Sequence, residues 1–147
     1  LLWTENPIDF QGKWHHIESA GINPLPVQRP IPIWMGAGAP GIPVGPNRVL
    51  RRVGRMADGY FPLCEAGDTA RKLIETVKQY AQEAGRNPDD LKIEGRIELT
   101  GTPEDWQAQV AAWENLGADA VSVGTARAPF NTPDEHIQAI KTFKDVI

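Results

Sequence analysis

The sequence predicts an α/β fold in which short parallel strands alternate with amphipathic helices. Between residues 31 and 147, four apolar runs of strand length are each followed by a segment whose apolar residues recur at helical spacing. Capping residues precede most of these helical segments, and glycines follow two of them. This alternation favours a parallel sheet with right-handed crossovers, which is either a small open sheet or half of an eight-unit barrel.

Composition narrows the class of protein. The chain has 147 residues, of which 41% are hydrophobic and 23% charged, and its net charge is -4. These values are typical of a compact globular protein and argue against nucleic acid or an anionic membrane as a partner. The single cysteine excludes an internal disulfide framework and fits a reducing compartment, so we expect a cytoplasmic protein. No apolar run reaches the length of a membrane span.

Residues 1–30 are predicted to form an irregular N-terminal segment. Two short β-type runs flank Gln11-Gly12, which indicates a small hairpin. Three prolines then fall within residues 21–30 and indicate an extended connector. The chain starts at Leu1 rather than Met, and "LLW" is typical of the end of a helix. We therefore expect processing or truncation.

The first two strand–helix units follow at residues 32–85. "PIWMG" predicts a short buried strand, and "GYFPL" predicts a second strand. The helix predicted over residues 48–57 has an apolar face made by Val49, Leu50, Val53 and Ala57. The second helix is predicted over residues 68–84, with Asp68 as its N-cap and Gly85 as its C-terminal cap.

The last two units are predicted in residues 92–147. "KIEGRIEL" alternates apolar and charged residues, and "ADAVSVG" predicts a fourth strand. Each is followed by a Thr-Pro helix start in which an acidic residue completes a capping box. Three apolar residues mark one face of the last predicted helix, namely Ile137, Ile140 and Phe143.

The glycine-rich junction "GAGAPG", residues 36–41, is the first loop after a strand. Glycines let backbone N–H groups approach a ligand, and the following helix start favours an anion such as phosphate. The pattern matches neither the dinucleotide-binding fingerprint nor a P-loop. On composition alone, a loop that binds no ligand and only needs a freely adaptable backbone explains the glycines equally well.

Other candidate residues have more ordinary interpretations. Four arginines form one face of the first helix, and we expect that face to be solvated, although Arg48 lies near the helix start. The three histidines lack partners at ligand spacing, so we expect no metal site. Cys64 is interpreted as a small apolar filler. We expect the alternating charges of the third strand, at Glu94, Arg96 and Glu98, to form a structural ion-pair network.

Four stretches together resemble the C-terminal half of the luciferase-like monooxygenase family. They are "AGINPLPVQRPIPIWMG", "LRRVGRMADGYFP", "EAGRNPDDLKIEGRIEL" and "LGADAVSV". The resemblance covers nearly the whole chain and is strongest to the branch of F420-dependent oxidoreductases. It implies a TIM (β/α)8 barrel of which residues 31–147 supply the last four βα units. It also implies hydride transfer between a small-molecule substrate and coenzyme F420, with FMN as the alternative cofactor.

The same resemblance implies where the cofactor phosphate binds. The implied residues surround the glycine-rich junction and the next helix start, namely Gly36, Ala37, Gly38, Ala39, Asn47 and Arg48. This chain inserts "APGIPVGPN" there and offers no hydroxyl, so backbone N–H groups would hold the phosphate. The units that usually carry catalysis in the family are absent, so no catalytic residue is assigned.

A half-barrel also has a non-enzymatic interpretation. Its two open sheet edges and apolar face need a covering partner. We expect a homo-oligomer or pairing with a missing N-terminal half. The alternative function is a non-catalytic half-barrel fragment or a self-associating phosphate-binding module.

Overall fold

A computed structural model of the chain describes residues 3–38 and 44–147. The chain divides into two compact units, Leu1–Pro32 and Ile33–Ile147. The helix end expected at Leu1-Leu2 lies outside the described residues, and Trp3 lies in a turn.

The first unit is built on a two-stranded hairpin. Strand β1 (Ile8–Gln11) pairs antiparallel with β2 (His16–Ala20). Gln11 pairs with His16, and the Gly12 N–H donates to the His15 carbonyl oxygen over 2.8 Å. The predicted hairpin is therefore confirmed, with its turn at residues 12–15 and Gln11 still in the strand. All residues of the connector 21–33 are described, and none of them is in a helix or strand.

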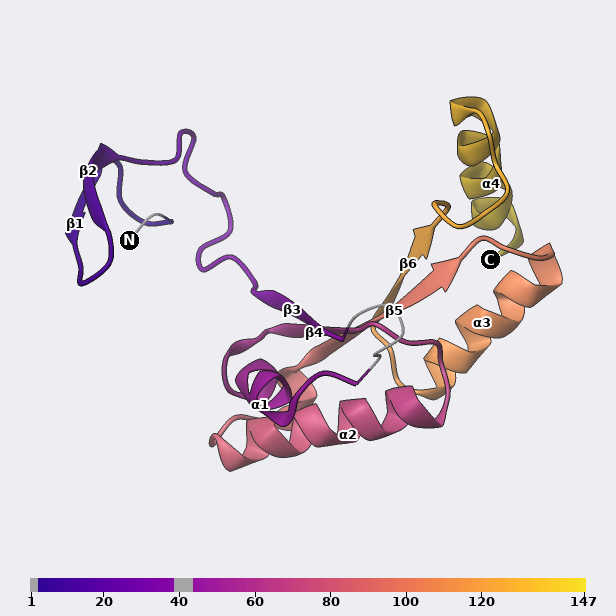
Figure 1. Cartoon of the computed structure of the whole chain (residues 1–147), viewed down its shortest axis with the longest axis horizontal. Helices are drawn as coiled ribbons and strands as arrows, with labels where there is room; N and C mark the ends of the chain where they lie inside the picture. Colours follow the sequence, from indigo (N-terminus) through magenta and orange to yellow (C-terminus); the bar gives the residue numbers. More distant parts are fainter. Residues whose placement is uncertain (1–2, 39–43) are drawn as a thin grey trace. The chain divides into compact units, whose positions relative to one another are not determined.

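The second unit contains the four expected βα units, and their order is confirmed (Figure 1). Its parallel sheet has the strand order β3-β4-β5-β6, made by β3 (Trp34–Ala37), β4 (Gly59–Pro62), β5 (Lys92–Glu98) and β6 (Ala120–Gly124). The helices are α1 (Asn47–Met56), α2 (Asp68–Glu83), α3 (Pro103–Asn115) and α4 (Pro133–Val146). A short 3-10 turn, η1 (Pro88–Asp90), precedes β5.

Within the described residues of the second unit, the helical layer lies on one face of this sheet and no element covers the other. On the covered face Tyr60, Ile93 and Ile97 are at most 1% exposed and pack with apolar residues of the helices. Side chains at the alternate positions point to the opposite, uncovered face. There Trp34 lies over Gly59 and is 43% exposed, so the prediction of a buried first strand is wrong. The reason is that Trp34 sits on the uncovered face of the edge strand.

Two aspartates tie neighbouring strands together at their amino ends. The Ile33 N–H donates to Asp58 Oδ2 over 2.8 Å, and the Asp58 N–H donates to the Ile33 carbonyl over 2.8 Å. Asp119 and Ile93 repeat the same reciprocal pair, also at 2.8 Å in both directions. Burial opposes ionisation of Asp119, but the Ile93 N–H and the nearby Lys92 hold its pKa below the usual value.

Helix ends follow the sequence signals with one exception. Thr102 with Asp105 and Thr132 with Glu135 form the two expected capping boxes. Gly85 and Gly117 both adopt φ +75° after α2 and α3, as expected of C-terminal caps. Asp68 is not an N-cap, because Gly67 holds that position. Asp68 is instead the first helical residue, where its charge still complements the helix dipole.

The last helix buries less apolar surface than its sequence predicts. Ile137 and Ile140 are 51% and 45% exposed, so part of the predicted apolar face is left uncovered by the described residues. Phe143 faces Trp106 of α3 with ring centroids 6.3 Å apart, and Ala139 is 7% exposed. Within the described residues α4 packs against α3, and nothing in this part of the chain covers its other flank.

Gly95 of β5 lets α3 pack closely on the sheet. A Cβ at this position would lie 2.4 Å from Cδ2 of Trp113, whose indole is 1% exposed. The Trp113 Nε1–H donates to the Arg96 carbonyl oxygen over 3.2 Å. The indole therefore occupies the space that a side chain at position 95 would need.

We expect Gly95→Ala to lower the free energy of unfolding by about 1–3 kcal/mol, because the added methyl overpacks the Trp113 site. Denaturant titration followed by tryptophan fluorescence measures this change. Gly36→Ala is the matched control, since a Cβ there comes no closer than 3.5 Å to the Phe61 carbonyl. Equal stability of the two variants would contradict the packing role of Gly95.

Candidate functional site

The carboxyl ends of all four strands lie at one edge of the sheet, because the strands are parallel. The last residues of the strands there are Ala37, Pro62, Glu98 and Gly124. In α/β folds this edge and the loops that follow it bind ligands. This edge is therefore the candidate location of the functional site.

The β3–α1 junction brings the end of the strand close to the start of the helix. A Cβ on Gly45 would lie 2.9 Å from Ala37 Cβ and 3.4 Å from the Gly38 nitrogen. Gly38 has φ +117°, a conformation that favours glycine. Gly36 is exposed, whereas Ala37 is 4% exposed and packs in the core. Ala39, the fourth residue expected at this junction, lies outside the described residues.

The start of α1 differs electrostatically from the starts of the other helices. Its N-cap is Pro46, no side chain caps it, and its first turn has no acidic residue. The first turns of α2, α3 and α4 all contain at least one carboxylate. Asn47 and Arg48 form the first turn of α1 and both are exposed. The first turn of α1 therefore carries an exposed cation and no carboxylate, which suits an anion.

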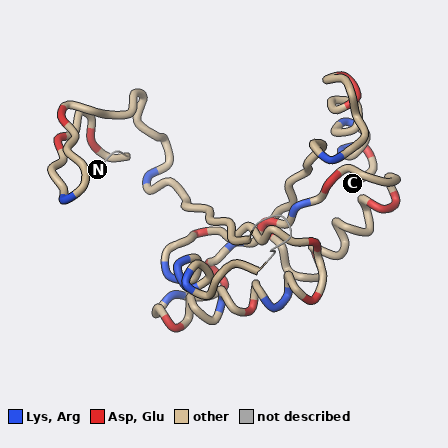
Figure 2. The backbone as a smooth tube through the Cα atoms, viewed as in Figure 1, with Lys and Arg blue, Asp and Glu red and all other residues tan. Residues whose placement is uncertain are grey.

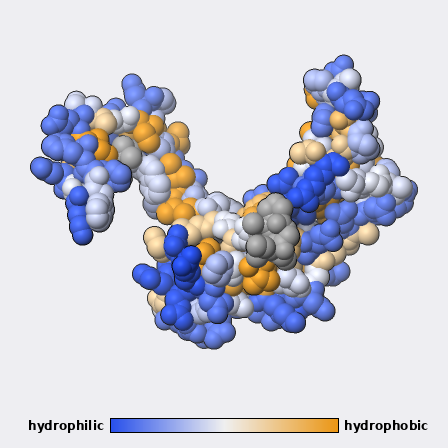
Figure 3. Space-filling model, viewed as in Figure 1, coloured by the Kyte–Doolittle hydropathy of each residue, from blue (hydrophilic) through white to orange (hydrophobic). Residues whose placement is uncertain are grey.

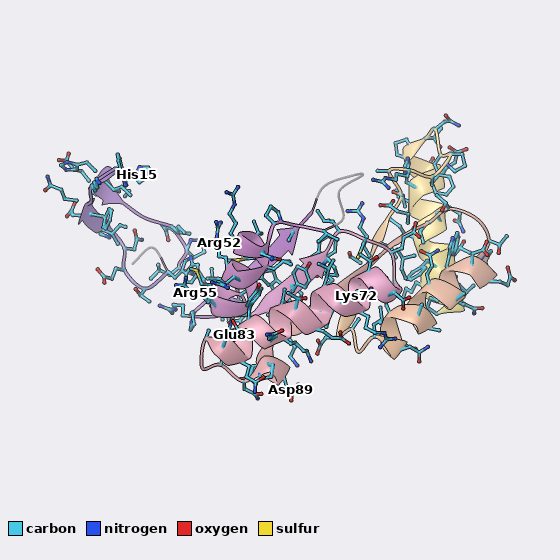
Figure 4. The ribbon with its side chains drawn as sticks, turned by 60° about the horizontal axis from the view of Figure 1, so that its bottom comes forward. His15, Arg52, Arg55, Lys72, Glu83 and Asp89 are labelled. Atoms are coloured by element: carbon cyan, nitrogen blue, oxygen red, sulfur yellow. The ribbon has the colours of Figure 1, made fainter. Side chains whose placement is uncertain are left out.

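The four arginines of α1 lie on its exposed surface, as expected from their spacing (Figure 2). Arg51 places its guanidinium 5.1 Å from the ring centroid of Tyr80 on α2. Arg52 and Arg55 lie on the surface of α1 (Figure 4). Of the four, Arg48 is in the first turn and therefore lies nearest to the helix start.

The charged row of β5 forms one ion pair. Arg96 Nε lies 2.8 Å from Oε1 of Glu98, whereas Glu94 forms no ion pair in the part of the chain that the structure describes. All three residues are on the uncovered face of the sheet, and Glu98 ends the strand. The expected network therefore consists of one pair at the carboxyl edge.

Cys64 follows β4 at the same edge and is half-buried. Burial, followed by the charge of Glu65, raises the pKa of its thiol. Burial also raises the pKa of the neighbouring Tyr60 hydroxyl, which has no hydrogen-bond partner among the described residues. A raised thiol pKa opposes nucleophilic chemistry at Cys64.

Two of the histidines have contacts within their own unit. His16 pairs with Glu18 in the hairpin at 3.0 Å, and His136 stacks edge-on with Phe130 at 5.3 Å between ring centroids. Among residues 3–38 and 44–147, no group of three His, Cys, Asp or Glu side chains is placed to hold a metal ion.

A cavity that the sequence does not reveal lies between the start of α3 and α4. Its volume is about 430 Å³, and its lining includes Leu99, Gly101, Trp106, Phe130 and Ala139. Its residues come from segments that meet only in the folded chain, so no sequence pattern marks it. Figure 3 shows apolar surface near β3. Among the exposed apolar side chains are Trp34 of β3 and Ile137 and Ile140 of α4.

Comparison with known proteins identifies the family. The sequence profile of the luciferase-like monooxygenase family matches residues 1–97, about two thirds of the chain. The chain belongs to this family. The resemblance that the sequence motifs indicated is thus confirmed, and so is membership of an enzyme family.

Curated relatives in this family are named F420-dependent glucose-6-phosphate dehydrogenases. One from Mycolicibacterium gilvum (strain PYR-GCK) is 31% identical over 81% of this chain and 34% of its own length. One from Rhodococcus hoagii (strain 103S) is 27% identical over 98% of this chain and 48% of its own length. The chain thus spans at most about half the length of these relatives.

Solved structures support the fold. The F420-dependent tetrahydromethanopterin reductase of Methanopyrus kandleri superposes with a TM-score of 0.50 over 99% of this chain and 51% of its own, at 16% identity. An F420-dependent secondary alcohol dehydrogenase superposes with a TM-score of 0.51 over 99% and 49%, also at 16% identity. The four βα units are therefore part of a TIM-type barrel, as the resemblance implied.

A search of the described residues for membrane spans finds no helix with the necessary length and apolar character.

We expect the Cys64 thiol to be alkylated by iodoacetamide more slowly than an unperturbed peptide thiol at the same pH. Its raised pKa lowers the thiolate fraction, so the rate should rise with pH through a midpoint above the ordinary thiol value. Mass spectrometry of the modified chain over a pH series measures this rate. A fast reaction at neutral pH would show an activated cysteine instead.

Proposed function

We propose that this chain is the cofactor-phosphate-binding part of an F420-dependent oxidoreductase of the luciferase-like family. The observation that supports the proposal most directly is the start of α1 beside the carboxyl end of β3, because this helix start has no side-chain cap, no acidic residue in its first turn and an exposed Arg48. The F420-dependent names of the curated relatives favour F420 over FMN, and a dehydrogenase over a monooxygenase.

In this proposal the β3–α1 junction holds the phosphate of the cofactor. Backbone N–H groups of Gly36, Ala37, Gly38 and Ala39 would line one side, and Asn47 and Arg48 the other. Gly45 supports the arrangement, because its lack of a side chain lets the helix start approach Ala37. The side chain of Ala37 is buried, so only its backbone can contribute.

The bound deazaflavin would supply a ring carbon that accepts a hydride from a small-molecule substrate. The residues of this chain would fix the cofactor through its phosphate and present the uncovered sheet face to the ring. Fixing the cofactor matters because hydride transfer requires a short and well-oriented approach of the two carbons. The proposal assigns no catalytic residue to the chain.

The proposal also includes an assembly. Strands β3 and β6 are the two ends of the sheet, and α4 exposes Ile137 and Ile140. Such edges and apolar surface need partners. Further βα units would close the barrel, either from the same polypeptide or from a second copy of the chain. A cytoplasmic location belongs to the proposal, and the single free cysteine is compatible with it.

We expect the protein containing this chain to bind F420, and Arg48→Glu to weaken that binding about tenfold or more. The reversed charge would repel the phosphate at the helix start. Quenching of the intrinsic fluorescence of F420 on titration with protein gives the Kd. Arg52→Glu is the matched control, because this side chain lies on the exposed surface of the same helix (Figure 4).

Three outcomes would count against the proposal. FMN binding in place of F420 would move the protein to the flavin branch. Equal weakening by Arg48→Glu and Arg52→Glu would show a general effect of charge and reject the phosphate site. Binding of inorganic phosphate without either cofactor would favour a phosphate-binding module that has no redox role.

A further inference from the structure

The Arg96–Glu98 pair is held against β6 by a glycine. A Cβ on Gly124 would lie 2.7 Å from Arg96 Nη2 and 2.7 Å from Glu98 Oε2. The guanidinium and the carboxylate therefore occupy the space that a side chain at position 124 would fill. Gly124 pairs with Glu98 in the β5–β6 ladder, and both residues end their strands. The pair thus sits at the carboxyl edge, on the face without helices.

This pair has unused hydrogen-bonding capacity. Arg96 donates from Nε to Glu98 Oε1, and its terminal nitrogens have no acceptor in the described part of the chain. Glu98 Oε2 is buried and has no donor among the described residues. A buried carboxylate oxygen without a donor is costly, so it calls for a partner. Rotation of the carboxylate about its last bond exchanges the two oxygens, because that torsion is soft.

We propose that Arg96 and Glu98 form a binding subsite for a hydroxyl group of the substrate. The terminal N–H groups of Arg96 would donate to the hydroxyl oxygen, and the Glu98 carboxylate would accept the hydroxyl proton in a hydrogen bond. A hydroxyl is both donor and acceptor, so it matches this donor–acceptor pair. The inference rests on the proposed function and names the substrate class for the same carboxyl edge.

The charge of the subsite argues for a hydroxyl rather than a second anion. Arg96 and Glu98 cancel each other, so the pair has no net charge with which to hold an anion. A neutral hydroxyl can still use both the donor and the acceptor of the pair. The start of α1 at Asn47 and Arg48 is positively charged instead. An anionic group would therefore bind at that helix start, and a neutral hydroxyl at the Arg96–Glu98 pair.

The test measures binding to the full-length protein by calorimetry, with glucose 6-phosphate, D-glucose and 2-propanol as probes. We expect at least one probe to bind, and Glu98→Gln to raise its Kd about tenfold, as the loss of a charge-assisted hydrogen bond requires. Arg96→Lys should weaken binding as well, because lysine lacks the planar fork. Gly124→Ala should weaken it without changing any charge, by displacing the pair.

Glu94→Gln is the matched control, since Glu94 lies two residues earlier on the same face than Arg96 and forms no ion pair with any described residue. We expect it to leave probe binding unchanged. The Kd of F420, measured by fluorescence without substrate, should be the same in all variants. Thermal unfolding of each variant identifies any loss of folded protein.

Three results would overturn the inference. They are the absence of binding by every probe, equal weakening by Glu98→Gln and Glu94→Gln, and a change confined to the Kd of F420. Failure of the proposed function is distinguishable from these results. In that case F420 would not bind, while the probes would still bind in a manner that depends on Glu98.

Discussion

The alternation of side chains along the parallel strands is the constraint on which the rest of the structure depends. In β5 the residues Ile93, Gly95 and Ile97 face the helices, while Glu94, Arg96 and Glu98 face the uncovered side. A shift of one residue would place three charges in the core. The same register that builds the core therefore also places the charged row where a ligand can reach it. The alternation along β5 thus determines both which residues enter the core and where the charged row lies.

Glycines allow close contacts between neighbouring elements at three positions. Gly95 admits the indole of Trp113, Gly45 brings the start of α1 against Ala37, and Gly124 accommodates the Arg96–Glu98 pair. The first contact stabilises the fold, and the other two shape the carboxyl edge. In each case the absent side chain leaves room for another group. These glycines therefore matter for their small size rather than for backbone flexibility. The edge is consequently built from strand ends that approach one another closely.

Local signals in the sequence predicted most elements correctly. The capping boxes at Thr102 and Thr132 and the caps at Gly85 and Gly117 depend on neighbours within a few residues, so sequence reasoning found them. Asp68 was one residue from its predicted role, because a cap is decided by backbone geometry at Gly67. The exposure of Trp34 and Ile140 was missed, since periodicity shows which residues share a face and not whether anything covers it.

The sequence by itself determined the order of four βα units, the starts and ends of the helices, the basic face of α1 and the family to which the chain belongs. These features depend on the spacing of residues and on contiguous motifs. They can therefore be predicted without knowledge of contacts between distant residues. Only the tertiary structure decided that Arg96 pairs with Glu98 over Gly124, that Asp58 and Asp119 tie adjacent strands, and that a cavity forms between α3 and α4. The contact of the pair with Gly124, the two aspartate ties and the cavity join residues far apart in the chain, and their geometry exists only once the strands are in register.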